Sequence, residues 1–302
     1  MVAADVEYGA RGTVLLIAQT EAGERRWREA ARAAGCRIAA AVPWEEAAER
    51  LPTIVSADAL VLDAEHEAET LGQTLDAVCR TADHRGAAAF VAVPANLIDA
   101  VSRAMNSSRI EFLIDSTGGE RAFELAVATD PVSPALNDIA KGQATAKLQQ
   151  LSEEVGRIAS ILAALSEDEA AAAAVVGVES GEMGAGDRIE SGQIRAIIRA
   201  RRLRDHFFCS ELFADPAWDM LLDLTAARLE KQRVAVSSLC IAAAVPPTTA
   251  LRWIKALCDQ GIFVRIADPE DGRRVFIELA EKSAQAMEKY LKAAQRVSAL
   301  IV

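Results

Sequence analysis

Four side chains between residues 248 and 255 are of the types that proteins use to contact DNA. They are Thr248, Thr249, Arg252 and Lys255, and the first of them directly follows Pro247. An arginine can donate two hydrogen bonds to a guanine, a lysine neutralises a phosphate, and a threonine hydroxyl donates to a phosphate. Proline is favoured in the first turn of a helix, where its missing N–H costs nothing. We therefore expect a DNA-reading helix that begins at Pro247.

A second basic pair, Arg273 and Arg274, follows the dipeptide Asp271-Gly272. Such a dipeptide favours a tight hairpin turn, which would place both arginines at the tip, within reach of a phosphate or a minor groove. Ser237 is expected to cap a short supporting helix that ends near Ala244. These patterns together predict a DNA-binding surface.

A different chemistry is indicated by Asp63, which ends the apolar run ALVLD. A carboxylate is a possible ligand of a metal ion. Acidic and imidazole side chains follow at Glu65, His66, Glu67 and Glu69. Because nothing in the sequence holds them in a ligand geometry, we interpret them as a solvated acidic loop and expect no metal site. Residues 19–26, QTEAGERR, hold one glycine where a dinucleotide site needs three, so no cofactor is expected.

The N-terminal part of the chain alternates apolar runs with helical patterns. The apolar runs are 13–18, 37–41, 59–63, 87–93 and 109–115, and the helical patterns are 22–34, 44–51, 67–82, 96–106 and 118–128. Continuous apolar strands separated by helices indicate a parallel sheet covered on both faces. We expect residues 1–133 to form a five-stranded, doubly wound α/β domain.

Residues 134–191 are expected to form a helix followed by a flexible linker. Apolar side chains recur there every three or four residues, at Leu148, Leu151, Val155, Ile158, Leu162 and Leu165. This spacing is typical of a coiled-coil seam and predicts a dimer, with packing of the helix on the N-terminal domain as the alternative. Residues 166–191 are acidic and then rich in glycine, which favours a linker.

Residues 192–302 predict three helices, a β-hairpin and a last helix, which is the α+β order of a winged helix-turn-helix domain. The two β-rich runs are 262–267 and 274–280. Met287 and Leu291 belong to an apolar stripe on the last helix, and we expect this stripe to contribute to dimerisation.

The C-terminal domain resembles the MarR family of winged-helix transcription regulators. TTALRWIKALCDQGIFVR (248–265) looks like the family's recognition helix running through Gly261 into the first wing strand. DPEDGRRVFIEL (268–279) resembles the family's wing. The resemblance implies a protein that binds double-stranded DNA as a dimer. The terminal helices of the domain would hold the two chains together. Members of the family usually begin with a dimerisation helix, whereas in this chain a whole domain precedes the corresponding helix.

Residues 12–130 resemble the receiver domain of bacterial response regulators. Asp63 matches the phosphoacceptor position, but Ala18 and Gln19 stand where receivers carry an acidic pair that holds Mg²⁺. Val93 and Asp115 stand where receivers carry Thr or Ser and Lys. The resemblance therefore implies a pseudo-receiver in which Asp63 is a vestigial phosphoacceptor without a cation clamp.

Charge is distributed unevenly along the 302 residues. The chain carries a net charge of -11, with a balance of -15 over residues 1–191 and +4 over residues 192–302. A basic end on an acidic body is compatible with one module that contacts phosphates. No apolar run reaches the ~18 residues of a membrane span, and the five cysteines form no CxxC pair, so a cytoplasmic protein with reduced thiols is expected.

The sequence thus predicts a homodimeric, sequence-specific DNA-binding transcription regulator that is not an enzyme. Its receiver-like domain would serve dimerisation or the docking of a signalling protein. Two alternatives stay open: a signalling adaptor whose two domains bind proteins rather than DNA, and a small-molecule enzyme built on the N-terminal domain.

Overall fold

The computed structural model of the chain describes residues 12–54, 57–129, 189–207, 214–269, 271 and 274–299. We call residues 12–129 the N-terminal half and residues 189–299 the C-terminal half, and both belong to one compact unit. Several predicted site residues lie outside the described residues: Leu148, Leu151, Val155, Ile158, Leu162, Leu165 and Arg273.

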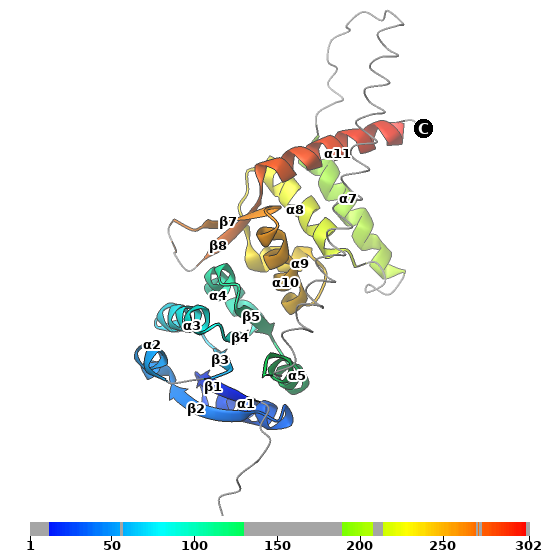
Figure 1. Cartoon of the computed structure of the whole chain (residues 1–302). Coiled ribbons are helices and arrows are strands. Elements are labelled where there is room, and N and C mark those ends of the chain that lie inside the picture. The colour runs from blue at the N-terminus through cyan, green and yellow to red at the C-terminus, as the bar shows by residue number, and fades with distance from the viewer. Residues whose placement is uncertain are drawn as a thin grey trace, which may run out of the picture. The chain divides into compact units, whose positions relative to one another are not determined.

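The N-terminal half contains the predicted five-stranded parallel sheet (Figure 1). Its strands are β1 (Thr13–Ala18), β2 (Arg37–Pro43), β3 (Ala59–Asp63), β4 (Ala88–Val93) and β5 (Ile110–Ile114), in the order β2-β1-β3-β4-β5. All neighbours are parallel, and every residue of β3 is buried because both faces of the sheet are covered. The strand order reverses between β1 and β3, which is where open α/β sheets gather their functional side chains.

Helices cover both faces of this sheet. On one face lie α1 (Glu21–Ala33) and α5 (Gly118–Thr129), which pack Trp27 and Leu125 against the sheet. On the other face lies α3 (Leu71–Arg85), whose Leu75 and Val78 are fully buried. Edge strand β5 is paired on one side only, to β4, so its outward backbone groups need partners from another element.

Two predicted helices, 44–51 and 96–106, are broken into single turns. Helix α2 (Ala47–Arg50) lies between 3₁₀ turns, as does α4 (Ile98–Val101). In the first case Pro52 lacks the N–H that would continue a helix. In the second, the Ser102 hydroxyl donates to the carbonyl of Asp99 at 2.8 Å, a local bond that competes with the helical ladder.

The C-terminal half has the helix, helix, helix, hairpin, helix order that the sequence predicts (Figure 1). The helices are α7 (Ser191–Leu203), α8 (Pro216–Glu230), α9 (Val236–Ala242), α10 (Pro247–Asp259) and α11 (Glu281–Ala299). The strands β6 (Val234–Ala235), β7 (Phe263–Ala267) and β8 (Val275–Leu279) form an antiparallel sheet in the order β6-β8-β7. The sequence analysis did not anticipate β6.

Two expectations about this half need correction. Ser237 is not the cap of α9, because the helix begins at Val236 and its N-cap is Ala235. Met287 and Leu291 are buried within the single chain, each 5% exposed, and they pack in a cluster with Ile194, Leu222 and Ala226. Side chains that fill the core of one chain are not a free surface for dimerisation.

The turn between α9 and α10 contains a strained residue. Ala244 has φ 52°, in the left-handed region, and is exposed. For a residue with a Cβ this conformation costs about 1–2 kcal/mol, which exceeds the extra entropy that a glycine loses on folding, about 0.5–1 kcal/mol.

We therefore predict that Ala244→Gly raises the free energy of unfolding by about 1 kcal/mol, measured by chemical denaturation. The control is Ala242→Gly at the end of α9, which should lower stability because its backbone is helical. If Ala244→Gly loses as much stability as the control, the left-handed backbone conformation of Ala244 is not strained.

Candidate functional site

Helix α10 is the predicted DNA-reading helix, and it begins at Pro247 as expected. Ala250, Ile254 and Leu257 are buried and pack inward, because their spacing places them on one face of the helix. Thr249 is exposed, and Pro247 is half-buried. The helix therefore presents Thr249 at its N-terminal end to solvent.

A second face of α10 contacts the edge of the parallel sheet. The hydroxyl oxygen of Thr248 accepts a hydrogen bond from the backbone N–H of Ile114 at 3.0 Å. The Lys255 ammonium donates to the carbonyl oxygens of Ser108 and Ile110, at 3.0 and 2.8 Å. Two of the predicted DNA contacts thus satisfy outward backbone groups at and next to β5.

Arg252 lies on the same face and pairs with two carboxylates of the N-terminal half. It donates to Glu124 on α5, and its Nε is 3.6 Å from a carboxylate oxygen of Glu111 on β5. Burial lowers the pKa of Arg252, but the hydrogen bonds and charges of Glu124 and Glu111 outweigh that effect and raise it. The side chain is 48% exposed, so each pair contributes little to stability.

Ser237 of α9 makes a further contact with the N-terminal half. Its backbone N–H and its hydroxyl donate to the two oxygens of the Asp99 carboxylate, at 2.9 and 2.6 Å. Asp99 belongs to α4. After β5 with Glu111 and α5 with Glu124, α4 is thus the third element of the N-terminal half whose carboxylate contacts α9 or α10.

Leu251, which was not among the predicted site residues, is 3% exposed. In a helix it shares a face with Thr248, Arg252 and Lys255, because these positions are spaced by three or four residues. Leu251 belongs to a hydrophobic cluster that includes buried residues of both halves. A large apolar side chain among the presumed DNA contacts was the available signal that this face is covered by protein.

The wing is the antiparallel hairpin of β7 and β8. Arg274 directly precedes β8; its side chain is 61% exposed and lies 3.5 Å from the carboxylate of Asp271. Its partner in the prediction, Arg273, is outside the described residues. Arg274 therefore stays accessible to a large ligand.

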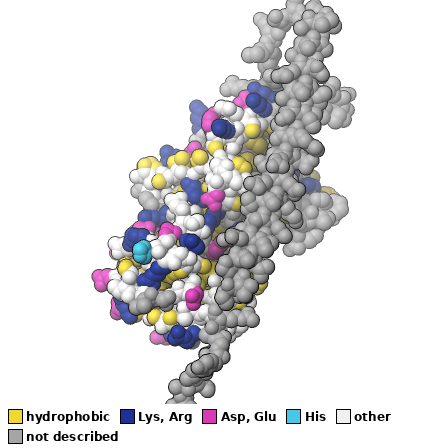
Figure 2. Space-filling view, viewed as in Figure 1, with side chains coloured by type: hydrophobic (Ala, Val, Ile, Leu, Met, Phe, Trp, Pro, Cys, Tyr) yellow, Lys and Arg dark blue, Asp and Glu magenta, His cyan; other side chains and the backbone are white. Residues whose placement is uncertain are grey.

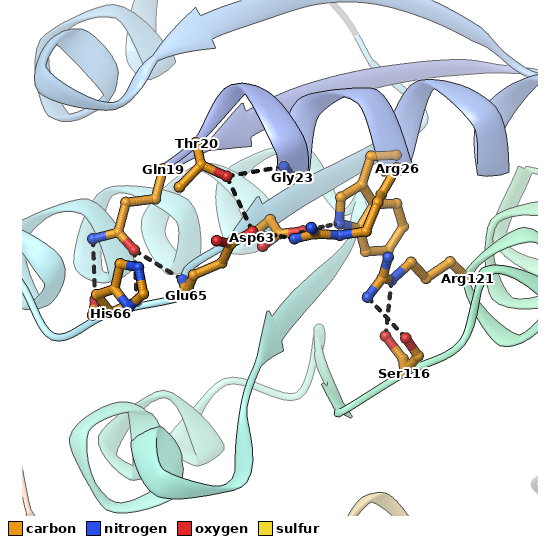
Figure 3. A network of polar contacts seen from close by, with 10 residues as sticks. Gln19, Thr20, Gly23, Arg26, Asp63, Glu65, His66, Ser116 and Arg121 are labelled. Carbon is orange, nitrogen blue, oxygen red and sulfur yellow. Dashed lines mark hydrogen bonds and ion pairs between the residues drawn. The ribbon is translucent and has the colours of Figure 1, made fainter.

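The second candidate site surrounds Asp63 at the end of β3 (Figure 3). Asp63 is 4% exposed, and its carboxylate accepts a hydrogen bond from the indole N–H of Trp27 at 2.7 Å. Helix α1 lies directly on it: a Cβ added to Gly23 would be 3.2 Å from the carboxyl carbon. Asp63 is enclosed by α1.

The loop after β1 also closes over this site. The Gln19 side-chain oxygen accepts the backbone N–H groups of Glu65 and His66, both at 2.8 Å, and Gln19 donates to the carbonyl of His66 (Figure 3). Thr20 caps α1 by accepting from Gly23, and its hydroxyl donates to Glu65. Gln19 and Thr20 thus tie the loop after β1 to the loop after β3.

Two arginines near Asp63 correct the expectation that the site lacks cations. Arg26 is 3.8 Å from an Asp63 oxygen and forms an ion pair with Glu65. Arg121 of α5 is positioned by the hydroxyl and carbonyl of Ser116, and its guanidinium lies 5.5 Å from the Trp27 ring centre. Since Gly23, Arg26 and Trp27 share one face of α1, their spacing was a usable signal.

Burial raises the pKa of Asp63, and it does so against the opposing effects of Arg26 and the Trp27 hydrogen bond. The hydrogen bond from Arg26 is the largest effect that lowers the pKa of Glu65. Within the described ranges, no three His, Cys, Asp or Glu side chains are grouped as metal ligands. Of the acidic residues after β3, Glu65 is engaged by Arg26 and Thr20, while Glu67 and Glu69 are exposed.

On the face drawn in Figure 2, basic and acidic side chains are interspersed over the described residues. A search of these same residues finds no helix with the length and apolar character of a membrane span.

Comparisons with known proteins give only partial structural likenesses. No protein-family model matches the chain, and no curated protein matches it either. Part of the chain is similar to the transcriptional regulator Tm0710 from Thermotoga maritima, with 19% identity over 36% of this chain and 74% of that one and a TM-score of 0.26.

Two streptococcal proteins show similar likeness. The heme sensor protein PefR from Streptococcus agalactiae is 14% identical over 38% of this chain and 81% of its own, with a TM-score of 0.25. The adhesin competence repressor AdcR from Streptococcus pyogenes is 15% identical over 38% and 80%, with a TM-score of 0.24.

The raised pKa of Asp63 predicts a pH dependence of stability. A carboxyl whose pKa is higher in the folded state favours folding below its ordinary pKa, near 4, and this contribution is lost as the pH rises through the raised value. Asparagine cannot ionise. Asp63→Asn should therefore raise the melting temperature relative to the parent at about pH 8, with a smaller difference at about pH 4. A lower melting temperature of the variant at the higher pH would show that ionised Asp63 stabilises the fold through Arg26.

Proposed function

We propose that this protein is a DNA-binding transcription regulator and not an enzyme. The observation that carries the proposal is the C-terminal half: α9, a turn and α10, followed by a two-stranded wing with an exposed arginine, Arg274, in the loop between its strands. In helix-turn-helix proteins the second helix enters the major groove and its N-terminal residues contact base edges. Arg252 is assigned to a guanine edge, Thr248 and Thr249 to a phosphate or a thymine methyl, and Lys255 to a phosphate, with Ser237 as a further residue of the DNA-binding surface.

The wing supplies a test of DNA binding that leaves the contacts of α10 unchanged, because the ion pair of Arg274 is with Asp271 of the wing itself. Replacing both with alanine should weaken binding to duplexes of every sequence and reduce the slope of log affinity against log salt by about 2. Fluorescence anisotropy with a 30-base-pair random-sequence duplex, titrated at several salt concentrations, measures both quantities.

The matched control is Lys282→Ala with Lys289→Ala, which removes the same charge from exposed positions of α11. If the wing variant loses no more affinity than this control, the wing does not contact DNA.

The proposed regulator acts as a homodimer through the apolar seam 148–165 and the helices of the C-terminal half. In the described part of the chain, α7 and α11 leave Ile197 and Tyr290 exposed, at 39% and 49%. Dimerisation would place two DNA-reading helices on successive turns of one face of the duplex.

Leu151→Glu with Ile158→Glu should weaken the dimer, because each charge would enter a dry seam unless the helices separate. Sedimentation equilibrium should show a shift toward the monomer mass. Gln149→Glu with Ser160→Glu adds the same charge outside the apolar repeat and should leave the mass unchanged. An unchanged mass in the seam variant would place dimerisation elsewhere.

A signalling adaptor is the second candidate function, and one observation favours it. The polar face of α10 already contacts protein groups, at Ile114, Glu111 and Glu124. An adaptor would retain that contact and bind no duplex at any salt concentration. The duplex titration therefore separates the two functions.

A further inference from the structure

We propose that the DNA-reading face of α10 has an internal occupant, the β5 edge and the neighbouring carboxylates of the receiver-like half, which DNA must displace. This inference rests on the proposed DNA-binding function. It assigns to the receiver-like half a role that needs no phosphoryl chemistry: it competes with DNA for the same side chains.

The contact uses the side chains assigned to DNA. Thr248, Arg252 and Lys255 all bond to groups between Ser108 and Glu124, and Ser237 bonds to Asp99. Leu251 is buried on the same face. An α10 held in this way cannot enter a major groove, because its second face is covered by β5 and by Glu124.

The chemistry of the occupant resembles that of a duplex. The groups that face Arg252, Lys255 and the Ser237 hydroxyl are carboxylate and carbonyl oxygens, which are hydrogen-bond acceptors. A duplex offers arginine and lysine the same kinds of partner, in its phosphate oxygens and guanine edges. Three carboxylates, those of Asp99, Glu111 and Glu124, carry the negative charge that phosphates would supply.

The stability of the closed state, in which β5 and Glu124 cover α10, decides how much this contact weakens DNA binding. Arg252 is about half exposed, so its ion pairs are screened by water and salt. The hydrogen bonds of Lys255, Thr248 and Ser237 and the burial of Leu251 contribute as well. When only an open fraction of the protein can bind, the apparent dissociation constant is the intrinsic value divided by that fraction. Loosening the closed state must therefore tighten DNA binding.

The test is duplex binding by the full chain with the variant Glu111→Gln and Glu124→Gln, which leaves every proposed DNA contact intact. We expect this variant to bind the 30-base-pair random-sequence duplex at least about fivefold more tightly than the parent. The control is Glu45→Gln with Glu49→Gln, which makes the same change of charge at exposed positions of the same half. The control should change affinity by less than about twofold, since only general repulsion of DNA is reduced.

A second variant covers the case in which glutamine still bonds Arg252. Glu124→Lys sets two like charges against each other and should tighten duplex binding further, while Glu45→Lys makes the same reversal away from α10. Circular dichroism of each variant establishes that it is folded.

The outcomes separate the two claims. Equal binding by the parent, the glutamine variant and the lysine variant overturns the occlusion and leaves the proposed DNA binding in place. If each control variant gains as much duplex affinity over the parent as its test variant does, the occlusion is also overturned. If no variant binds duplex at low salt, both the occlusion and the DNA-binding function are wrong.

Discussion

The open edge of strand β5 is the constraint on which the arrangement of the chain depends. A parallel sheet leaves backbone N–H and C=O groups unpaired along each edge strand, and proteins cover or blunt such edges. Here the outward N–H of Ile114 and the carbonyls of Ser108 and Ile110 find partners on α10. The element that covers the edge is also the one whose charges and position are suited to reading DNA.

Because α10 both covers the β5 edge and carries the residues that we propose contact DNA, the two halves of the chain are linked in the proposed function. The N-terminal half has a doubly wound sheet, and the Asp63 carboxylate at the end of β3 is enclosed by Trp27 and α1, with Gln19 and Thr20 tying the adjoining loops. What the fold offers instead is a surface of carboxylates and carbonyls next to its last strand. Regulation would then depend on whatever shifts the balance between this surface and DNA as partners of Arg252 and Lys255.

The sequence predicted the elements better than their contacts. The five strands and the inward face of α10 follow from apolar runs and helical spacing, which are local properties. The broken helices at 44–53 and 95–106 depend on Pro52 and on the Ser102 hydroxyl, which compete with the helical ladder over a single turn. Arg26, Arg121 and Leu251 were missed because their roles depend on residues far away in the chain, and a basic residue on a helix has the same pattern whether it faces DNA, water or a carboxylate.

If DNA and the β5 edge exclude each other on α10, then binding of DNA must change amide hydrogen exchange at both elements. The full chain would be compared with and without a saturating 30-base-pair duplex, following peptides that cover residues 108–114 and 247–259. The account predicts faster exchange at Ile114 and its neighbours when DNA binds, together with slower exchange in α10. Slower exchange in α10 with no change at β5 would show that DNA binds while the edge stays covered, and would contradict the account.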